Sequence, residues 1–277
     1  MSDCNDLHHN VNERNLRGVY KMTVKNGDES ILQSVDNALK VIELFKDYEE
    51  LGVTQIADEL GIAKSTAFRL LNTLRSRKYV IKNDKTDNYR LGFLFATLGD
   101  IVKNRNEIIR ISQPYLAELT LDVLEVSYLS ILEDDYNIRF INKISENTRI
   151  SIYSSPVGNT MPAYCTAAGK AILSKLPEPR IEQYIRIVDL NKLTPNTITE
   201  KDKLRNELIK INQSNLSIDN EESEPGLTCF ATSILNPIGD VIAAISISGP
   251  TGRITIDKNN KIKALQKTAE NIMRELL

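Results

Sequence analysis

The sequence has little of what disulfide bonding, metal binding or nucleophilic catalysis requires. It contains no Trp, only 6% aromatic residues and three cysteines in 277 residues. An odd, widely spaced set of cysteines does not form a disulfide framework. The only histidines are the neighbours His8 and His9, so neither a Cys–His nucleophile nor a Cys/His metal cluster is indicated. No Walker-type or GxGxxG loop is present. We therefore expect no enzyme activity, no cofactor and no bound metal.

Membrane and export signals are missing as well. The longest apolar run, Val241–Ile245, is far too short to span a bilayer. The first residues show no basic segment followed by an apolar one, so no signal peptide is indicated. We expect a cytoplasmic protein with reduced cysteines, no membrane association, and a flexible polar tail over residues 1–29.

Charge is unevenly distributed in a chain of near-ordinary composition. Hydrophobic residues make up 41% and charged residues 26%, with a formal net charge of -2, which is typical of a globular protein of about two domains. Residues 60–90, however, contain eight basic residues and only two acidic ones, Asp84 and Asp87. This block indicates either a localised polyanion site or a solvated charged face.

The same region has the periodicity of a helix-turn-helix. Val35, Ala38, Leu39, Ile42 and Phe45 predict one apolar helix face, with Ser34 as its N-cap. A second helix follows Thr54 and ends at Gly61. A third begins near Lys64 and directs Ala67, Leu70, Leu71 and Leu74 inward. The short connection around Gly61 is typical of the motif.

A hairpin and a connecting helix follow. Residues 79–81 and 89–91 predict two short strands, and the polar residues 83–88 between them favour a turn. This is the order of a winged helix-turn-helix domain, which we assign to residues 30–92. Residues 93–104 are expected to be helical, within a linker helix assigned to 93–108.

One face of the third helix and the hairpin carries groups suited to DNA. Arg, Asn and Ser can hydrogen-bond to base edges, and Phe can contact a thymine methyl group. Basic residues of the hairpin would lie near phosphates. Alternatively, Phe68 is partly buried and the other side chains only solvate the helix. The predicted DNA contacts are Lys64, Ser65, Thr66, Phe68, Arg69, Asn72, Lys82, Lys85 and Arg90.

Residues 109–277 alternate between strands and helices, which predicts an α+β domain around an antiparallel sheet. Strands are expected at 126–132, 138–144, 150–153, 228–235 and 241–248, with a turn at 236–240. Helices are expected at 108–123, 167–175, 181–188, 199–212 and 257–276.

Two segments of this second domain suggest a ligand site. Thr166 can cap a helix whose small first residues, Ala167, Ala168 and Gly169, leave N–H groups open to an anion, although tight packing also favours small residues. Along the strand 243–248, alternation places Ser246 and Ser248 on one face. Glu221, Glu222 and Glu224 are interpreted as a solvated charge run, and a free cysteine as a small buried apolar residue.

Several motifs in sequence order resemble the IclR family of bacterial transcription regulators, from about Ile31 to the end of the chain. They are residues 34–39 (SVDNAL), 60–66 (LGIAKST), 69–71 (RLL), 165–171 (CTAAGKA), 226–229 (GLTC) and 244–250 (AISISGP).

The resemblance implies a winged helix-turn-helix, a linker helix and a GAF/PAS-like effector-binding domain. It also implies dimers or dimers of dimers on double-stranded operator DNA, and a small-molecule effector, often an organic acid. Lys170 belongs to the motif but is given no ligand role. The effector-binding residues expected by this resemblance are Ala167, Ala168, Asp219, Leu227, Cys229, Ser246 and Ser248.

Two other functions remain open at this point. A GAF-like domain could be an enzyme with Cys165 or Cys229 as a redox thiol, although no histidine is available to it. Alternatively, the chain could bind DNA without any effector. For a regulator, repression and activation are both compatible with these residues.

Overall fold

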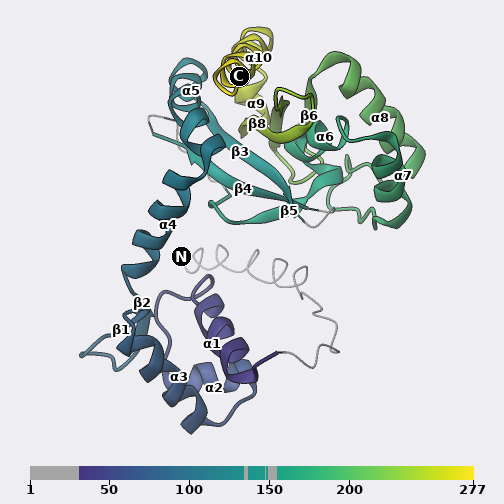
Figure 1. Cartoon of the computed structure of the whole chain (residues 1–277). Coiled ribbons are helices and arrows are strands. Elements are labelled where there is room, and N and C mark those ends of the chain that lie inside the picture. The colour runs from purple at the N-terminus through teal and green to yellow at the C-terminus, as the bar shows by residue number, and fades with distance from the viewer. Residues whose placement is uncertain (1–30, 134–136, 147, 149–154) are drawn as a thin grey trace, which may run out of the picture. The chain divides into compact units, whose positions relative to one another are not determined.

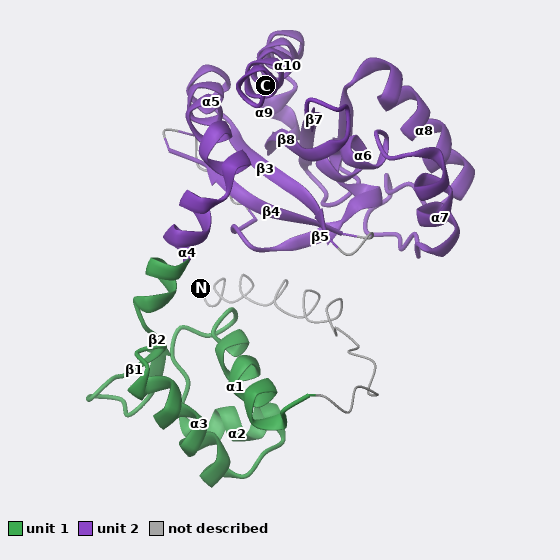
Figure 2. Ribbon diagram, in the orientation of Figure 1, with its two compact units in different colours: residues 1–98 green, residues 99–277 purple. Residues whose placement is uncertain are grey.

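A computed structural model describes residues 31–133, 137–146, 148 and 155–277. The chain divides into two compact units, residues 1–98 and residues 99–277 (Figure 2). The expected tail and the expected strand at 150–153 lie outside the described residues.

Unit 1 has the expected order of three helices and a hairpin (Figure 1). Gly61 ends the second helix in the left-handed region, with φ of 62°, and only three residues separate the second and third helices. The predicted helix-turn-helix and hairpin are therefore confirmed. The elements are α1 (Gln33–Leu44), α2 (Val53–Leu60), α3 (Lys64–Ser76), β1 (Val80–Lys82) and β2 (Tyr89–Leu91).

The first helix differs from the prediction in its cap and its buried face. Leu32, not Ser34, is the N-cap, and no side chain caps the helix. Val35 and Leu39 are 52% and 56% exposed, whereas Val41 is fully buried. The apolar residues of α1 cover more than one stripe of the helix, and periodicity alone did not show which stripe packs on α3.

Helix α4 (Leu94–Arg105) follows the hairpin where a connecting helix was expected. None of its residues is buried. The Tyr79 and Phe95 rings make an edge contact, with centroids 5.4 Å apart, which joins the start of α4 to the residue before β1.

Unit 2 contains one six-stranded antiparallel sheet with strand order β5-β4-β3-β8-β7-β6. Its strands are β3 (Val126–Glu133), β4 (Asn137–Ile144), β5 (Thr160–Pro162), β6 (Ser217–Asn220), β7 (Leu227–Leu235) and β8 (Val241–Pro250). Its helices are α5 (Glu107–Val123), a 3-10 turn η1 (Ala163–Cys165), α6 (Ala167–Leu173), α7 (Glu178–Ile187), α8 (Lys201–Ser214), α9 (Thr251–Ile254) and α10 (Lys258–Glu275). The α+β class is confirmed. The short edge strands β5 and β6 were not predicted because neither has a run of alternating apolar residues.

Each face of the sheet has its own apolar layer. Ile245 and Ile247 of β8 lie in the layer with α5 and α10, and Ala244 lies in the layer with α6. Because successive side chains of a strand point to opposite faces, Ser246 and Ser248 share the α6 face, as predicted. Both serines are buried.

The buried carboxylate of Glu125, directly before β3, joins this strand to helices α9 and α10. Glu125, only 1% exposed, accepts hydrogen bonds from the Arg253 guanidinium at 2.7–3.2 Å. The Lys261 ammonium lies 3.5 Å from the same carboxylate. Removing one partner of a buried pair leaves the other charge without its counter-ion.

We predict that Glu125→Gln lowers the free energy of unfolding by about 3 kcal/mol, because Arg253 and Lys261 lose their counter-ion. Urea unfolding of the full chain measures the change. The control is Glu200→Gln, since Glu200 pairs with Lys203 in solvent and such pairs contribute less than about 1 kcal/mol. Equal effects of the two substitutions would contradict the assignment.

Candidate functional site

The outer face of α3 presents donors and one aromatic ring to solvent. Ala67, Leu71 and Leu74 are buried in the core of unit 1, which directs the polar side of the helix outward. Phe68 is 50% exposed, so it belongs to this outer face and not to the core. All six predicted residues of the helix are exposed: Lys64, Ser65, Thr66, Phe68, Arg69 and Asn72.

The basic residues of the hairpin are not equivalent. The Lys82 ammonium lies 2.5 Å from the Asp87 carboxylate, and this hydrogen bond raises the pKa of Lys82. Lys85 and Arg90 are exposed, and no ion pair to another described residue engages either of them, although the Glu50 carboxylate attracts the Arg90 guanidinium. Lys85 and Arg90 are therefore available to an external anion, whereas Lys82 must first leave Asp87.

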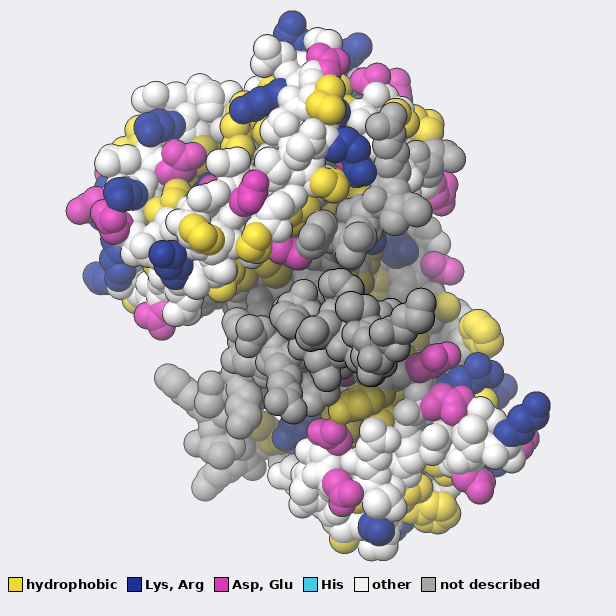
Figure 3. Space-filling view, turned by 180° about the vertical axis from the view of Figure 1, so that it is seen from behind, with side chains coloured by type: hydrophobic (Ala, Val, Ile, Leu, Met, Phe, Trp, Pro, Cys, Tyr) yellow, Lys and Arg dark blue, Asp and Glu magenta, His cyan; other side chains and the backbone are white. Residues whose placement is uncertain are grey.

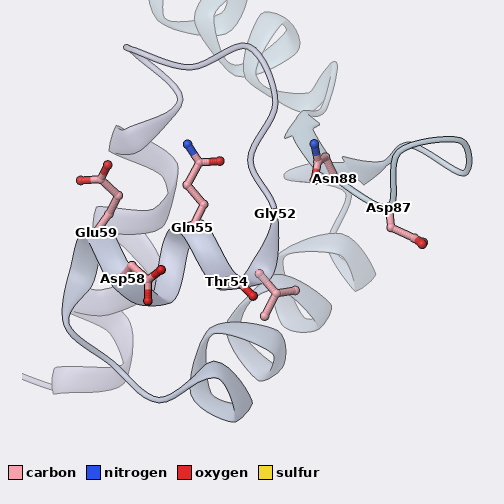
Figure 4. Close-up of a pocket in the computed structure, with 8 residues that line it drawn as sticks. Gly52, Thr54, Gln55, Asp58, Glu59, Asp87 and Asn88 are labelled. Atoms are coloured by element: carbon pink, nitrogen blue, oxygen red, sulfur yellow. The ribbon is translucent and has the colours of Figure 1, made fainter.

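An open pocket of about 860 Å³ lies between the start of α2 and the hairpin turn (Figure 4). It is lined by Gly52, Val53, Thr54, Gln55, Asp58, Glu59, Asp87 and Asn88. No motif in the sequence indicated this pocket. Its acidic side chains do not favour an anion, and nothing in the described residues identifies an occupant.

In unit 2 the sheet aligns several of the predicted effector residues. Asp219 pairs with Cys229 across β6 and β7, and Cys229 pairs with Ser248 across β7 and β8. The Cys229 Sγ and Ser248 Oγ atoms are 3.1 Å apart. Ser246 is on the same face one pair further along, opposite Ala231. Since α6 packs on β7 and β8, the row lies beneath α6, with Leu227 at the start of β7.

The first turn of α6 combines tight packing with free N–H groups. The Thr166 side chain accepts from the Gly169 N–H at 3.2 Å, which confirms the predicted cap. A Cβ on Gly169 would clash with the Ala163 carbonyl oxygen, so packing requires glycine there. Among the described residues, no acceptor meets the N–H groups of Ala167 and Ala168.

The Asp219 carboxylate is held by its own turn. It accepts from the Glu222 N–H at 2.7 Å and from the Ser223 hydroxyl at 2.5 Å. Burial raises the pKa of Asp219, and these hydrogen bonds oppose the rise. The side chain is therefore an acceptor fixed within the site and not a mobile surface charge.

Glu222 contradicts the prediction of a solvated acidic run. It is 6% exposed, and its Oε1 accepts a hydrogen bond from the fully buried Lys170 ammonium, which also donates to the Ile218 carbonyl at 2.7 Å. Its Oε2 has no partner among the described residues. Burial raises the pKa of the Glu222 carboxyl to about 7, and Lys170 opposes the rise. A lysine within an otherwise apolar helical segment was the signal that could have indicated this pair.

Neither cysteine of unit 2 has the environment of a reactive thiol. Cys165 is fully buried, and burial raises the pKa of both the Cys165 and the Cys229 thiols. A protonated thiol is a poor nucleophile, which argues against a redox cysteine. Cys4 lies outside the described residues.

Two other features are absent from the part of the chain that the structure describes. No group of three or more His, Cys, Asp or Glu side chains there is arranged to hold a metal ion. No helix there is long and apolar enough to cross a membrane. On the face of unit 2 drawn in Figure 3, basic and acidic side chains are interspersed.

Comparison with protein families gives two matches in chain order. Residues 34–84 match the IclR helix-turn-helix domain. Residues 101–274 match the family described as bacterial transcriptional regulator IclR, C-terminal. Each match falls within one of the two structural regions described above.

Individual proteins agree with these matches. The chain is 32% identical over 248 residues to the DNA-binding transcriptional repressor YiaJ of Escherichia coli (strain K12), covering 88% of each chain. The crystal structure of the Thermotoga maritima IclR protein is similar with a TM-score of 0.78 and 29% identity, covering 88% of this chain and 98% of that one. An IclR homolog from Microbacterium hydrocarbonoxydans, complexed with 4-hydroxybenzoate, shares the fold with a TM-score of 0.74 at 20% identity, covering 88% and 98%.

The Glu222 carboxyl generates a prediction about pH. Because its pKa is about 7 in the folded chain against an ordinary 4.5, the contribution of Glu222 to stability is complete below about pH 4.5 and is lost as pH rises to about 7. The unfolding free energy of the wild type minus that of Glu222→Gln should therefore fall across this window and stay constant above it.

Urea unfolding at a series of pH values measures that difference. The exposed Glu182 is the control, since its hydrogen bonds with Arg205 lower its pKa. The difference between the wild type and Glu182→Gln should change in the opposite direction, decreasing as pH falls through the acid range. No change for Glu222 between pH 4.5 and 7 would refute the assigned pKa shift.

Proposed function

This chain belongs to the IclR family of bacterial transcriptional regulators, and from this premise we propose that it binds operator DNA sequence-specifically under the control of a small organic acid. The family is one of regulators and not of enzymes. The observation that carries the proposal is the pairing, in one chain, of a solvent-facing donor helix with a buried polar row beneath α6.

Unit 1 supplies the proposed DNA contacts. Helix α3 enters the major groove, where Arg69 can donate two hydrogen bonds to guanine and Asn72 can pair with adenine. Lys64, Ser65, Thr66 and Phe68 complete this face. From the wing, Lys85 and Arg90 contact phosphates, and Lys82 joins them after leaving Asp87. We accordingly propose residues 30–92 as the DNA-binding domain and 93–108 as the linker.

Unit 2 supplies the proposed effector site, within residues 109–277. The free N–H groups of Ala167 and Ala168 take the effector's carboxylate, assisted by the partial positive charge at the start of α6. The hydroxyl groups of Ser246 and Ser248 donate hydrogen bonds to this carboxylate from the sheet. Leu227 and Cys229 provide apolar contact, and Asp219 accepts a hydrogen bond from a hydroxyl group of the ligand or from water.

The proposed effector site is closed to solvent, which limits how the effector enters. Ala167, Ala168, Asp219, Ser246 and Ser248 are all buried, so a ligand reaches them only by displacing neighbouring side chains. The Microbacterium homolog is complexed with 4-hydroxybenzoate, which is a small carboxylate. Such a molecule is the chemical class proposed here.

Two chains are proposed to act together. One helix-turn-helix reads only a few base pairs, and a symmetric dimer reads two half-sites. Helix α4 is suited to this contact, since Phe93 before it is 83% exposed and Leu98, Ile101 and Val102 are 39–63% exposed. We also propose that two such dimers can bind the operator together as a dimer of dimers. Sedimentation of the full chain as a 31.2 kDa monomer, with and without DNA, would exclude the dimer.

The direction of control and the location follow from the same proposal. YiaJ is named a transcriptional repressor, and we propose repression for this chain as well. Binding to chromosomal DNA assigns it to the bacterial cytoplasm. The effector then changes operator affinity only through unequal affinity for two arrangements of the dimer.

We predict that Arg69→Ala weakens operator binding by about 1–3 kcal/mol and relaxes base preference at one position, because a bidentate contact to guanine is lost. Fluorescence anisotropy with operator fragments selected from genomic DNA measures both effects. Lys85→Ala is the comparison, since losing a phosphate contact weakens all sequences about equally. Wild-type specificity in Arg69→Ala would show that α3 is not the recognition helix.

We predict that Ser246→Ala combined with Ser248→Ala abolishes the effector response and leaves operator binding intact, because the carboxylate loses two donors while unit 1 is unchanged. A panel of small carboxylates, including 4-hydroxybenzoate, is tested by thermal shift and by anisotropy. Ser112→Ala on α5 is the control, a buried serine of the opposite layer. A double variant that responds with wild-type affinity would place the pocket elsewhere.

A further inference from the structure

One acidic side chain holds the turn of the wing in place. Glu50 lies between α1 and α2 and is partly buried. Its Oε1 accepts from the Asn83 amide at 2.7 Å, and its Oε2 accepts from the Thr86 hydroxyl at 2.9 Å. These two hydrogen bonds lower the pKa of Glu50, so the group is a carboxylate at neutral pH and binds two points of the turn at once.

Hydrogen bonds connect Glu50, through Asn83, to Lys85 at the turn. The Asn83 amide that donates to Glu50 belongs to a side chain whose oxygen accepts from the Lys85 backbone N–H at 3.0 Å. Two hydrogen bonds in series therefore connect Glu50 to the backbone of Lys85. Lys85 itself is exposed and is free of ion pairs among the described residues.

Backbone hydrogen bonds fix the base of the wing, and within the turn the Asp87 N–H donates to the Asn83 carbonyl at 2.9 Å. Leu51 and Tyr89 exchange two backbone hydrogen bonds of 2.9 Å, and the Asn83 N–H donates to the Asn88 carbonyl at 2.7 Å. The Lys82–Asp87 ion pair joins the turn to β1 within the wing. Among the described residues, the side-chain hydrogen bonds that join the turn to a segment outside the wing are those of Glu50. Figure 4 shows Asp87 and Asn88 in this segment, across the open pocket from Thr54 and Gln55.

The charge of Glu50 has the wrong sign for its location. It lies beside the basic block of residues 60–90, and a carboxylate near DNA is repelled by phosphates. Electrostatics alone therefore predicts that removing Glu50 strengthens DNA binding. The hydrogen bonds predict the opposite, because an unbraced turn no longer presents Lys85 in a fixed position.

We propose that Glu50 is a positioning residue for DNA binding, which holds the wing turn so that Lys85 meets a phosphate. The inference rests on the proposed contact between wing and DNA. Glu50 itself touches no DNA in this arrangement. By holding the wing turn it strengthens DNA binding more than its negative charge weakens it.

The test compares substitutions that separate the effect of the two Glu50 hydrogen bonds, here called the brace, from the effect of the Glu50 charge. Glu50→Ala removes both. Glu50→Gln removes the charge but keeps the bonds, since an amide oxygen can accept from Asn83 and an amide N–H can donate to the Thr86 hydroxyl. Glu49→Ala is the matched control, because Glu49 is an exposed neighbour that makes no hydrogen bond or ion pair with another described residue.

The probe is a fluorescein-labelled, mixed-sequence DNA duplex, titrated with the full chain between about 50 and 200 mM KCl. We expect Glu50→Ala to bind about 3–10-fold more weakly, with a plot of log K against log salt less steep by about 1, the value of one phosphate contact. Glu50→Gln should bind at least as tightly as the wild type, and Glu49→Ala should be unchanged or slightly tighter. Thermal unfolding of all variants verifies that they are folded.

Binding by Glu50→Ala as tight as that of Glu49→Ala would overturn the inference. A loss in Glu50→Ala that Glu50→Gln does not restore would exclude the hydrogen-bonded brace as its cause. Lys85→Ala separates this inference from the proposed function. If Lys85→Ala weakens binding and Glu50→Ala does not, only the role of Glu50 fails. If the wild type does not bind the duplex, the proposed function itself fails.

Discussion

The alternation of side chains along β8 is the constraint on which the organisation of unit 2 depends. Ile245 and Ile247 enter the apolar layer of α5 and α10, while Ser246 and Ser248 lie beneath α6. A shift of one residue would exchange these two sets. It would place hydroxyl groups in the apolar layer of α5 and α10, where they lack partners. The register that forms the core is therefore the same register that aligns the polar row ending at Asp219.

Each unit uses one charged side chain to fix a turn that carries candidate contacts. In unit 2 the buried Lys170 joins α6 to the turn after β6, through Ile218 and Glu222. In unit 1 the carboxylate of Glu50 joins the chain before α2 to the wing. The surroundings differ in polarity. Breaking the buried pair would strand a charge in the interior, whereas the brace of the wing is close to solvent and affects position more than stability.

Regular and strongly periodic elements were predictable from sequence, and particular partners were not. The inward face of α3 and the alternation of β8 follow from spacing, and Thr166 follows from cap chemistry. The exposure of Val35 and Leu39 did not follow, because α1 has apolar residues around much of its surface and only its packing selects one stripe.

Glu222 appeared to be a surface charge because Lys170, its partner, is 52 residues away in sequence. No pattern in the sequence indicated the contacts of Glu50, whose partners Asn83 and Thr86 lie 33 and 36 residues further along the chain. Polar contacts between residues far apart in sequence leave no local pattern.

Control of DNA affinity by a small carboxylate is tested most directly by one titration. Genomic fragments retained by the purified chain are footprinted to define an operator, and its affinity is then measured against a panel of small carboxylates. The account predicts a two-fold symmetric protected site and at least one carboxylate that changes its affinity by about 5–150-fold, corresponding to about 1–3 kcal/mol of coupling. Binding no tighter to any fragment than to mixed-sequence DNA, or an operator affinity unchanged by every carboxylate that raises the unfolding temperature of the chain, would contradict it.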